Sequence, residues 1–171
     1  FLIILNVNLK EANLELTDQK KQFIENIGLF FETQHLPRLA GRIMGLLLIS
    51  DPPELAAAEI SNMLAMSKGS VSTMTRQLMQ FGLIEKVSPF GTHRDYYRIH
   101  PDATERILQA KQSEFLRLLA LVEKGMDALE SEDSSIHLRL VDLHTMCTLV
   151  STSIPELVKQ FRGLKKYATY E

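Results

Sequence analysis

The chain has 171 residues and a net charge of −2, with 45% hydrophobic and 23% charged residues. That composition is ordinary for a soluble globular protein, and the length suits one core or one domain with an appended element. Six prolines and eight glycines argue against a disordered or all-β chain, and the single cysteine, Cys147, excludes an internal disulfide. A lone cysteine also favours a reducing, cytoplasmic location, and the weak net charge means that any argument for nucleic acid must be local.

The first residues, FLIILNVNL, are apolar. A membrane span needs roughly 20 such residues, and this segment has about nine. It also lacks the basic region and the small-residue cleavage site of a signal peptide. We therefore expect no membrane partner, and we predict that residues 1–16 form an arm that packs on the core or on a partner.

Helical spacing of apolar residues predicts a helix from residue 17 to 36, capped by Thr17 or Asp18. Its apolar residues are expected in the core, and they are Phe23, Ile24, Ile27, Phe30 and Phe31. A second helix is predicted after Pro37 and is expected to be buried, because it is apolar nearly all round. Its apolar residues are Ile43, Met44, Leu46, Leu47 and Leu48. Gly41 and Gly45 allow another element to approach this helix closely.

Residues 56–101 predict two further helices and a β-hairpin. The helices cover residues 56–66 and 67–81. Two segments rich in aromatic and β-branched residues, 83–88 and 94–100, predict strands, and the turn-forming residues between them predict a hairpin. Helix, helix and hairpin in this order are the layout of a winged helix-turn-helix.

The second of these helices has an outer face of short and polar side chains. Ser67 is its N-cap candidate, and Gly82 suits the position after its end. The inward residues are predicted to be Val71, Met74, Leu78 and Phe81. The opposite face carries Gly69, Ser72, Thr73, Arg76 and Gln80. Short side chains let a helix enter the major groove of DNA, where its N-terminal residues contact base edges.

Basic charge is concentrated in the same part of the chain. Residues 67–100 hold five basic residues against two acidic ones, a surplus of three, so the remainder carries −5. DNA phosphates attract such a surplus. The pair His93–Arg94 at the hairpin tip is placed to reach a minor groove, where arginine is drawn to negative potential.

From residue 102 the chain is predicted to be helical again, with a seam of apolar residues typical of a helix–helix interface. In the first helix the seam consists of Phe115, Leu118, Val122, Gly125 and Leu129. In the second it consists of Ile136, Leu140, Leu143, Cys147, Val150, Ile154, Leu157, Phe161 and Leu164. Pro155 is expected to break or kink the second helix, with a capping box over residues 153–156 that starts a new one.

Other chemistry is weakly indicated. His137, His144 and Cys147 share a helix face, but Cys147 falls on the apolar seam and no carboxylate–histidine framework completes a metal site. We interpret them as polar residues at a helix interface. No phosphate-binding loop, nucleophile elbow, zinc-protease motif or dinucleotide fingerprint occurs, so we expect no enzyme, cofactor or metal.

Residues 22–100 resemble the MarR superfamily of bacterial and archaeal regulators, and most closely its GbsR-like branch. The stretches LPRLAGRIMGLLLISDPPELAAAEI and SKGSVSTMTRQLMQFGLI carry the resemblance. It implies a homodimer formed by the terminal helices, a recognition helix over residues 67–80 and a wing over residues 88–98. Many relatives respond to a small ligand, so a small-molecule effector is a candidate partner.

The predicted DNA-binding residues are Ser67, Lys68, Gly69, Ser70, Ser72, Thr73, Arg76, Gln77, His93 and Arg94. The resemblance assigns Lys68, Ser70, Ser72, Thr73 and Arg76 to groove or phosphate contacts. In the wing, relatives often carry two adjacent arginines, whereas the first of the pair here is His93. Which of His93 and Arg94 enters the minor groove stays open.

We therefore expect a mainly α fold with a small β-hairpin wing, in which dimerisation helices flank a winged helix-turn-helix. Its parts are an arm (1–16), a DNA-binding domain with leading helices (17–101) and a helical dimerisation region (102–171). The expected function is that of a cytoplasmic, sequence-specific transcriptional regulator, a homodimer on a palindromic operator in double-stranded DNA. The alternative is a winged-helix module for protein–protein interaction without DNA affinity.

Overall fold

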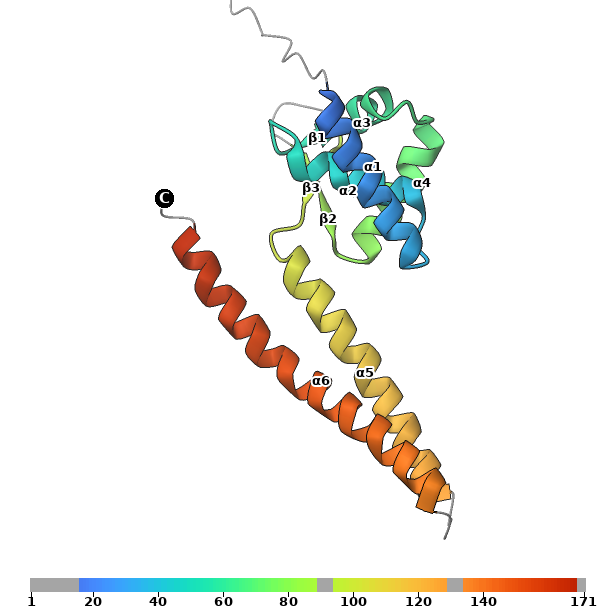
Figure 1. Cartoon of the computed structure of the whole chain (residues 1–171). Coiled ribbons are helices and arrows are strands. Elements are labelled where there is room, and N and C mark those ends of the chain that lie inside the picture. The colour runs from blue at the N-terminus through green and yellow to red at the C-terminus, as the bar shows by residue number, and fades with distance from the viewer. Residues whose placement is uncertain (1–15, 89–93, 129–133, 169–171) are drawn as a thin grey trace, which may run out of the picture. The chain divides into compact units, whose positions relative to one another are not determined.

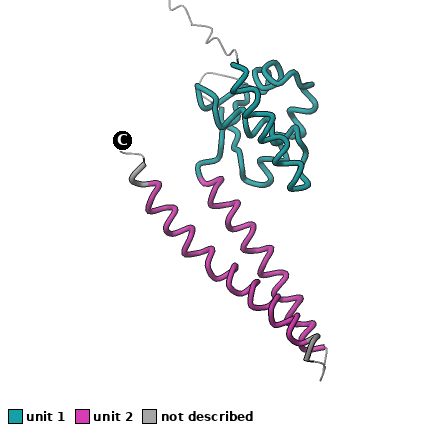
Figure 2. Tube along the Cα trace, viewed as in Figure 1, with its two compact units in different colours: residues 1–101 teal, residues 102–171 magenta. Residues whose placement is uncertain are grey.

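The computed structural model consists of two compact units, residues 1–101 and residues 102–171, shown in teal and magenta in Figure 2. The structure describes residues 16–88, 94–128 and 134–168. Nearly all of the predicted N-terminal arm, and the hairpin tip with His93, therefore lie outside the described residues.

The first unit combines helices with a small antiparallel sheet (Figure 1). In chain order its elements are α1 (Asp18–Thr33), α2 (Arg38–Ile49), β1 (Leu55–Ala56), α3 (Ala57–Met63), α4 (Lys68–Gln80), β2 (Ile84–Val87) and β3 (Tyr96–Ile99). The strand order is β1-β3-β2. The predicted hairpin corresponds to β2 and β3, whereas β1 was not predicted. Two residues are too few to show a strand period, and β1 is defined by its pairing, with Leu55 opposite Tyr97.

Helices α1 and α2 cross at close range, as the glycines predicted. A Cβ atom on Gly41 would lie 2.7 Å from Ile27 O, and one on Gly45 would lie 3.1 Å from Ile24 Cα. The distance at Gly41 leaves no room for a side chain, and the distance at Gly45 is tighter than an ordinary contact. The crossing therefore requires glycine on α2, and it places α1 directly against the buried helix α2.

One hydrophobic core joins the elements of the first unit. Side chains that are almost completely buried come from α2, β1, α3, α4 and β2, and they include Ile43, Leu46, Leu55, Ile60, Leu78 and Ile84. Each of these elements contributes an apolar face that is stabilised by removal from water. The core thus holds α4 by one side and leaves its other side outward.

Some residues predicted to be in this core are exposed instead. Phe23 and Phe30 on α1 are 39% and 59% exposed, and Leu48 on α2 is 49% exposed. Helix α1 packs through Ile24 and Phe31, which are seven residues apart and therefore lie on one face. The apolar stripe on α1 is wider than the contact with α2, so its flank faces outward within this chain.

The second unit is a pair of helices, α5 (Ala103–Ala128) and α6 (Ser134–Ala168), that pack along each other. Of the predicted seam, Val122, Cys147 and Ile154 are buried, whereas Leu157 and Leu164 are 49% and 70% exposed in the single chain. The buried residues of α6 are Cys147, Ser151, Ile154 and Val158. From Cys147 the buried stripe steps four residues to Ser151, whereas the predicted seam steps three residues to Val150. Because of this difference, Leu157 and Leu164 lie beside the buried stripe and not in it.

Helix α6 runs through Pro155 without interruption, so the predicted new start at residues 153–156 is wrong. A proline cannot donate the hydrogen bond that the carbonyl four residues earlier would accept, here Ser151 O. In the structure Gln112 Nε2 of α5 donates to Ser151 O at 3.0 Å. The neighbouring helix therefore supplies the missing donor, which explains how the helix continues past the proline.

The fold class is as predicted: mainly α-helical, with a small sheet that contains the hairpin. None of the helices in the described parts of the chain combines the length and the apolar character that a membrane span requires.

Candidate nucleic-acid interface

Helix α4 is capped at both ends, at the residues the sequence predicted. Ser67 Oγ accepts a hydrogen bond from Ser70 N at 3.1 Å, and the two hydroxyl oxygens lie 2.9 Å apart. Beyond the helix Gly82 has a φ of 67°, and Leu83 N donates to Leu78 O at 3.0 Å. This is a Schellman motif, whose left-handed position favours glycine. The caps fix where the helix begins and where the chain turns toward β2.

The inward face of α4 differs from the prediction at two positions. Val71, Thr75 and Leu78 are buried, whereas Phe81 is 49% exposed. On a helical wheel Thr75 lies about 40° from Val71, and Phe81 lies about 80° away. Burial of the threonine is tolerated because its Oγ1 donates to Val71 O at 2.8 Å. A hydroxyl that hydrogen-bonds within its own helix therefore substitutes for an apolar residue.

The outward face of α4 is exposed and consists of short or polar side chains. Its members are Lys68, Gly69, Ser72, Thr73, Arg76 and Gln80. Ser70 and Gln77, also predicted to bind DNA, are half-buried at its margin. Gln80 was not among the predicted site residues, although the helical wheel already placed it beside Arg76. Arg94 is exposed and belongs to the hairpin, not to α4.

Gly69 is not explained by packing within the chain. A Cβ atom there would meet only Ser67 Oγ, at 3.9 Å, which is ordinary van der Waals contact. Gly41 and Gly28, by contrast, face other atoms at less than 3 Å. Glycine costs helix stability, and packing within the described chain does not account for it at this position.

Ion pairs in the hairpin use part of the predicted basic surplus. Lys86 Nζ lies 2.8 Å from Asp95 Oδ2, and this hydrogen bond raises the pKa of Lys86 above its ordinary value. Arg98 Nε donates to Glu85 Oε1 at 2.7 Å. The Arg98 pair joins β3 to β2, and the Lys86 pair joins β2 to Asp95, which directly precedes β3. Within the described residues the cations of residues 67–100 that lie outside such pairs are Lys68, Arg76 and Arg94.

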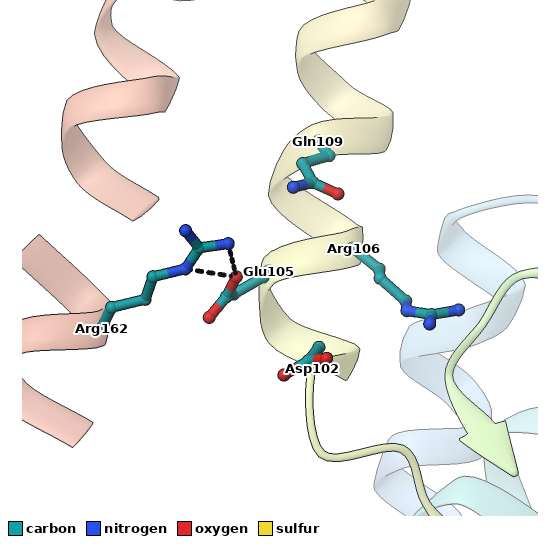
Figure 3. Close-up of a pocket in the computed structure, with 5 residues that line it drawn as sticks. All are labelled: Asp102, Glu105, Arg106, Gln109 and Arg162. Atoms are coloured by element: carbon teal, nitrogen blue, oxygen red, sulfur yellow. Dashed lines mark hydrogen bonds and ion pairs between the residues drawn. The ribbon is translucent and has the colours of Figure 1, made fainter. Parts of the chain in front are cut away.

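A small polar cavity of about 280 Å³ lies in the second unit (Figure 3). It is lined by Asp102, Glu105, Arg106, Gln109 and Arg162. Arg162 Nε donates to Glu105 Oε2 at 2.8 Å, and this contact lowers the pKa of the Glu105 carboxyl. The acids and bases largely offset each other, so the cavity has no marked preference for a charged ligand. In the described residues no group of three His, Cys, Asp or Glu side chains is arranged to hold a metal ion.

A helix-turn-helix followed by a β-hairpin, with a short polar face on its second helix, defines a winged helix-turn-helix DNA-binding module. The family model for the IclR helix-turn-helix domain matches residues 41–88. The HTH-type transcriptional regulator MmpR5 of Mycobacterium tuberculosis is 32% identical over 144 residues, which cover 82% of this chain and 85% of that protein. The chain therefore belongs to the family of winged helix-turn-helix transcriptional regulators, which bind DNA.

A solved structure also supports this assignment. The crystal structure of a transcriptional regulator matches with a TM-score of 0.69 and 30% identity, covering 85% of this chain and 99% of that chain. The reduced form of MarR from E. coli is more distant, with a TM-score of 0.38 and 14% identity over 72% of this chain and 88% of that chain. MmpR5 and the protein in the first of these crystal structures are both transcriptional regulators by name. The GbsR-like branch of the MarR superfamily stays a prediction.

Proposed function

We propose that this regulator acts in the cytoplasm as a homodimer on a palindromic operator, with one helix α4 in the major groove of each half-site. Its residues resemble those of the GbsR-like branch. The observation that carries the proposal is the outward face of α4, where Gly69, Ser72, Thr73 and Arg76 are all exposed. Exposed short side chains around one arginine allow a helix to approach base edges closely.

The roles within this interface follow from position and charge. Arg76, near the middle of the exposed face, suits a bidentate contact to guanine. Lys68, in the first turn, suits a phosphate, because free backbone N–H groups at a helix N-terminus also attract anions. Ser67 and Ser70 already hydrogen-bond to each other. They contribute to binding by fixing the first turn and by presenting remaining lone pairs.

The hairpin would supply a second contact. Arg94, next to His93 in the sequence, is the candidate, because a basic side chain on a wing reaches the narrow minor groove next to the recognition helix. The pairs Lys86–Asp95 and Arg98–Glu85 hold the base of this hairpin together. Because these pairs make the base of the hairpin rigid, the position of Arg94 is fixed once α4 lies in the major groove.

Dimer formation is supported by exposed apolar side chains on the second unit. Leu121 and Leu149 are each 65% exposed, Leu164 is 70% exposed, and Leu116 and Leu157 are nearly half exposed. Exposed leucines along both helices are candidates for burial against a partner. A second copy would cover it and set two α4 helices about 34 Å apart, which is one turn of DNA. A small-molecule effector stays a candidate further partner.

The experiment that tests the proposal selects bound sequences from a random duplex pool with the full chain. A palindrome with half-sites one turn apart is expected. On the selected site Arg76→Ala should cost about 1–3 kcal/mol and relax specificity at one position. Lys68→Ala should weaken all sequences equally and reduce the salt slope by about one. Lys159→Ala, an exposed cation of α6, is the matched control and should change neither.

Two outcomes would contradict the proposal. Selection of a site without two-fold symmetry would exclude the palindromic homodimer. Affinity that does not depend on salt would exclude phosphate contacts and favour the alternative, a protein–protein interaction module.

A further inference from the structure

The side chain of Arg42 links three helices of the first unit. Arg42 lies on α2, and its Nε is 3.3 Å from Glu25 Oε2 on α1. Its Nη2 donates a hydrogen bond to Leu64 O at 3.2 Å. Leu64 is the C-cap of α3, at the start of the turn that leads into α4. One guanidinium therefore connects the leading helix to the turn of the helix-turn-helix.

That turn is held by tertiary contacts as well as by its own backbone. Ala65 has a φ of 52°, a left-handed conformation that is unfavourable for alanine by about 1–2 kcal/mol. Met66 N donates to Ser61 O at 2.9 Å, and Ser61 Oγ donates to Met66 O at 2.6 Å. The Arg42 bond fixes the carbonyl just before Ala65. A cationic donor suits this position, because carbonyls at a helix C-terminus carry partial negative charge.

Gly28 makes room for this arrangement. A Cβ atom on Gly28 would lie 2.9 Å from Arg42 Cγ, so any other residue at this position of α1 would displace the arginine stem. The side chain of Arg42 is 28% exposed and is thus largely enclosed. The link from α1 to the turn is therefore built into the packing, not formed by a loose surface pair.

We propose that Arg42 is a positioning residue for DNA recognition, which fixes the angle at which α4 is presented by holding the Leu64 carbonyl against α1 and α2. This inference rests on the proposed role of α4 as the recognition helix. Arg42 is on α2, away from the outward face of α4, so it acts through the turn. Its loss would leave the phosphate contacts in place and misalign the base contacts, which depend on exact helix placement.

Arg38 is a matched control one turn earlier on α2. Its Nε donates to the same carboxylate, Glu25 Oε1, at 2.6 Å, and its Cγ also packs next to Gly28, 3.1 Å from the position of an added Cβ. Its second ion pair is with Glu32, again on α1. Arg38→Met and Arg42→Met thus remove the same charge and a pairing with Glu25 on α1. Arg38→Met also removes the pair with Glu32, and only Arg42→Met removes the bond to the turn.

The experiment uses the full chain, its selected operator and a random duplex in a salt series. Arg42→Met should lower the ratio of specific to non-specific affinity about tenfold, which corresponds to the loss of one good base contact. The slope of affinity against salt concentration should stay unchanged. Amide exchange at Ala65 and Met66 should become faster. Arg38→Met should keep the specificity ratio and the exchange rates of the wild type.

If Arg42→Met does not fold, Arg42→Lys carries the same test, because its single ammonium cannot hold both Glu25 and Leu64 O. Arg42→Lys should lower the ratio of specific to non-specific affinity by less than Arg42→Met does. Equal ratios for the Arg42 and Arg38 variants would overturn the inference. An equal loss of affinity for the operator and for random duplex would also overturn it, because a merely structural role of Arg42 predicts that result. Arg76→Ala separates the two proposals: if it leaves the ratio unchanged, the role of α4 itself fails.

Discussion

Glycine occurs at the two ends of α4 for different physical reasons, and the difference is testable. Gly82 has a φ of 67° in the Schellman motif that ends α4, where an L-residue is strained. Gly69 lies in the first turn of α4, where an added Cβ would make only an ordinary van der Waals contact with Ser67 Oγ. The first is required by the fold, whereas the second is required by the proposed contact with DNA.

We predict that Gly69→Ala raises the free energy of unfolding by about 0.5–1 kcal/mol, because alanine is a better helix former, while it weakens operator binding. Gly82→Ala should lower the free energy of unfolding by about 1–2 kcal/mol through backbone strain. Urea unfolding and operator titration measure both quantities. If Gly69→Ala binds the operator like the wild type, no backbone approach occurs at the first turn.

The sequence predicted these helix caps correctly, but it did not predict which side chains around each helix are buried. The caps Thr17, Ser67 and Gly82 depend on neighbouring residues only, and each is found where it was predicted. Phe30 and Phe81 have the right spacing for a buried stripe, but the partner elements contact a narrower strip beside them. The width of that contact is a tertiary property that spacing does not contain.

At the scale of elements, the continuity of α6 depends on a residue from another helix. Pro155 leaves the carbonyl of Ser151 without its helical donor, and Gln112 of α5 replaces it. The sequence predicted a break or kink at Pro155 and a new helix start, whereas α6 continues through it. The compensation could not be predicted, because Gln112 and Ser151 are 39 residues apart in the chain.

We predict that Gln112→Ala lowers the free energy of unfolding by about 1–3 kcal/mol, since the buried Ser151 carbonyl loses its partner. In the background of Pro155→Ala, whose N–H can bond to Ser151 O, the same change should cost less. Urea unfolding of the four variants in this double-mutant cycle measures the coupling. Strict additivity would show that Gln112 and Pro155 act independently.

The pair Glu105–Arg162 joins α5 to α6 and predicts a pH dependence. Arg162 lowers the pKa of Glu105 below its ordinary value of 4.5. A carboxylate with a depressed folded-state pKa stabilises the fold above its unfolded pKa, and that contribution is lost as pH falls through the folded value. Glu105→Gln should therefore be less stable than the wild type at neutral pH, and the difference should shrink below pH 4.5.

The measurement is urea unfolding of both proteins between neutral pH and the acid limb. Lys111→Gln, which removes an exposed pair with Glu114 on α5, is the control and should show a much weaker effect. A gap between wild type and Glu105→Gln that stays constant to the lowest pH would show that the charge of Glu105 is not responsible.

At the scale of the whole molecule, the two units serve different parts of the proposed function. The first presents α4 with a face that its own fold does not use. The second leaves leucines exposed along both helices, more than a helix pair can bury by itself. Sequence periodicity predicted both units and the hairpin, because helices and strands impose regular spacing. It did not separate the α5–α6 contact from the leucines left outside it, since both are apolar at helical spacing.

This separation gives the last prediction. Leu121→Asp and Leu149→Asp change side chains that are 65% exposed in the single chain, so each protomer should keep its fold. Placed in a dimer interface, an unpaired carboxylate is costly, and we expect the variants to sediment at half the mass of the wild type. Affinity for the full palindrome should fall steeply, while affinity for one half-site should remain, because each α4 stays intact.

Leu48→Asp is the matched control, since it places the same charge on an exposed leucine of α2 in the other unit. It should leave the sedimentation mass unchanged. If Leu121→Asp and Leu149→Asp also remain dimeric and bind the palindrome as tightly as the wild type, the exposed leucines of α5 and α6 do not form the dimer interface. The half-site spacing must then be set by another surface of the chain.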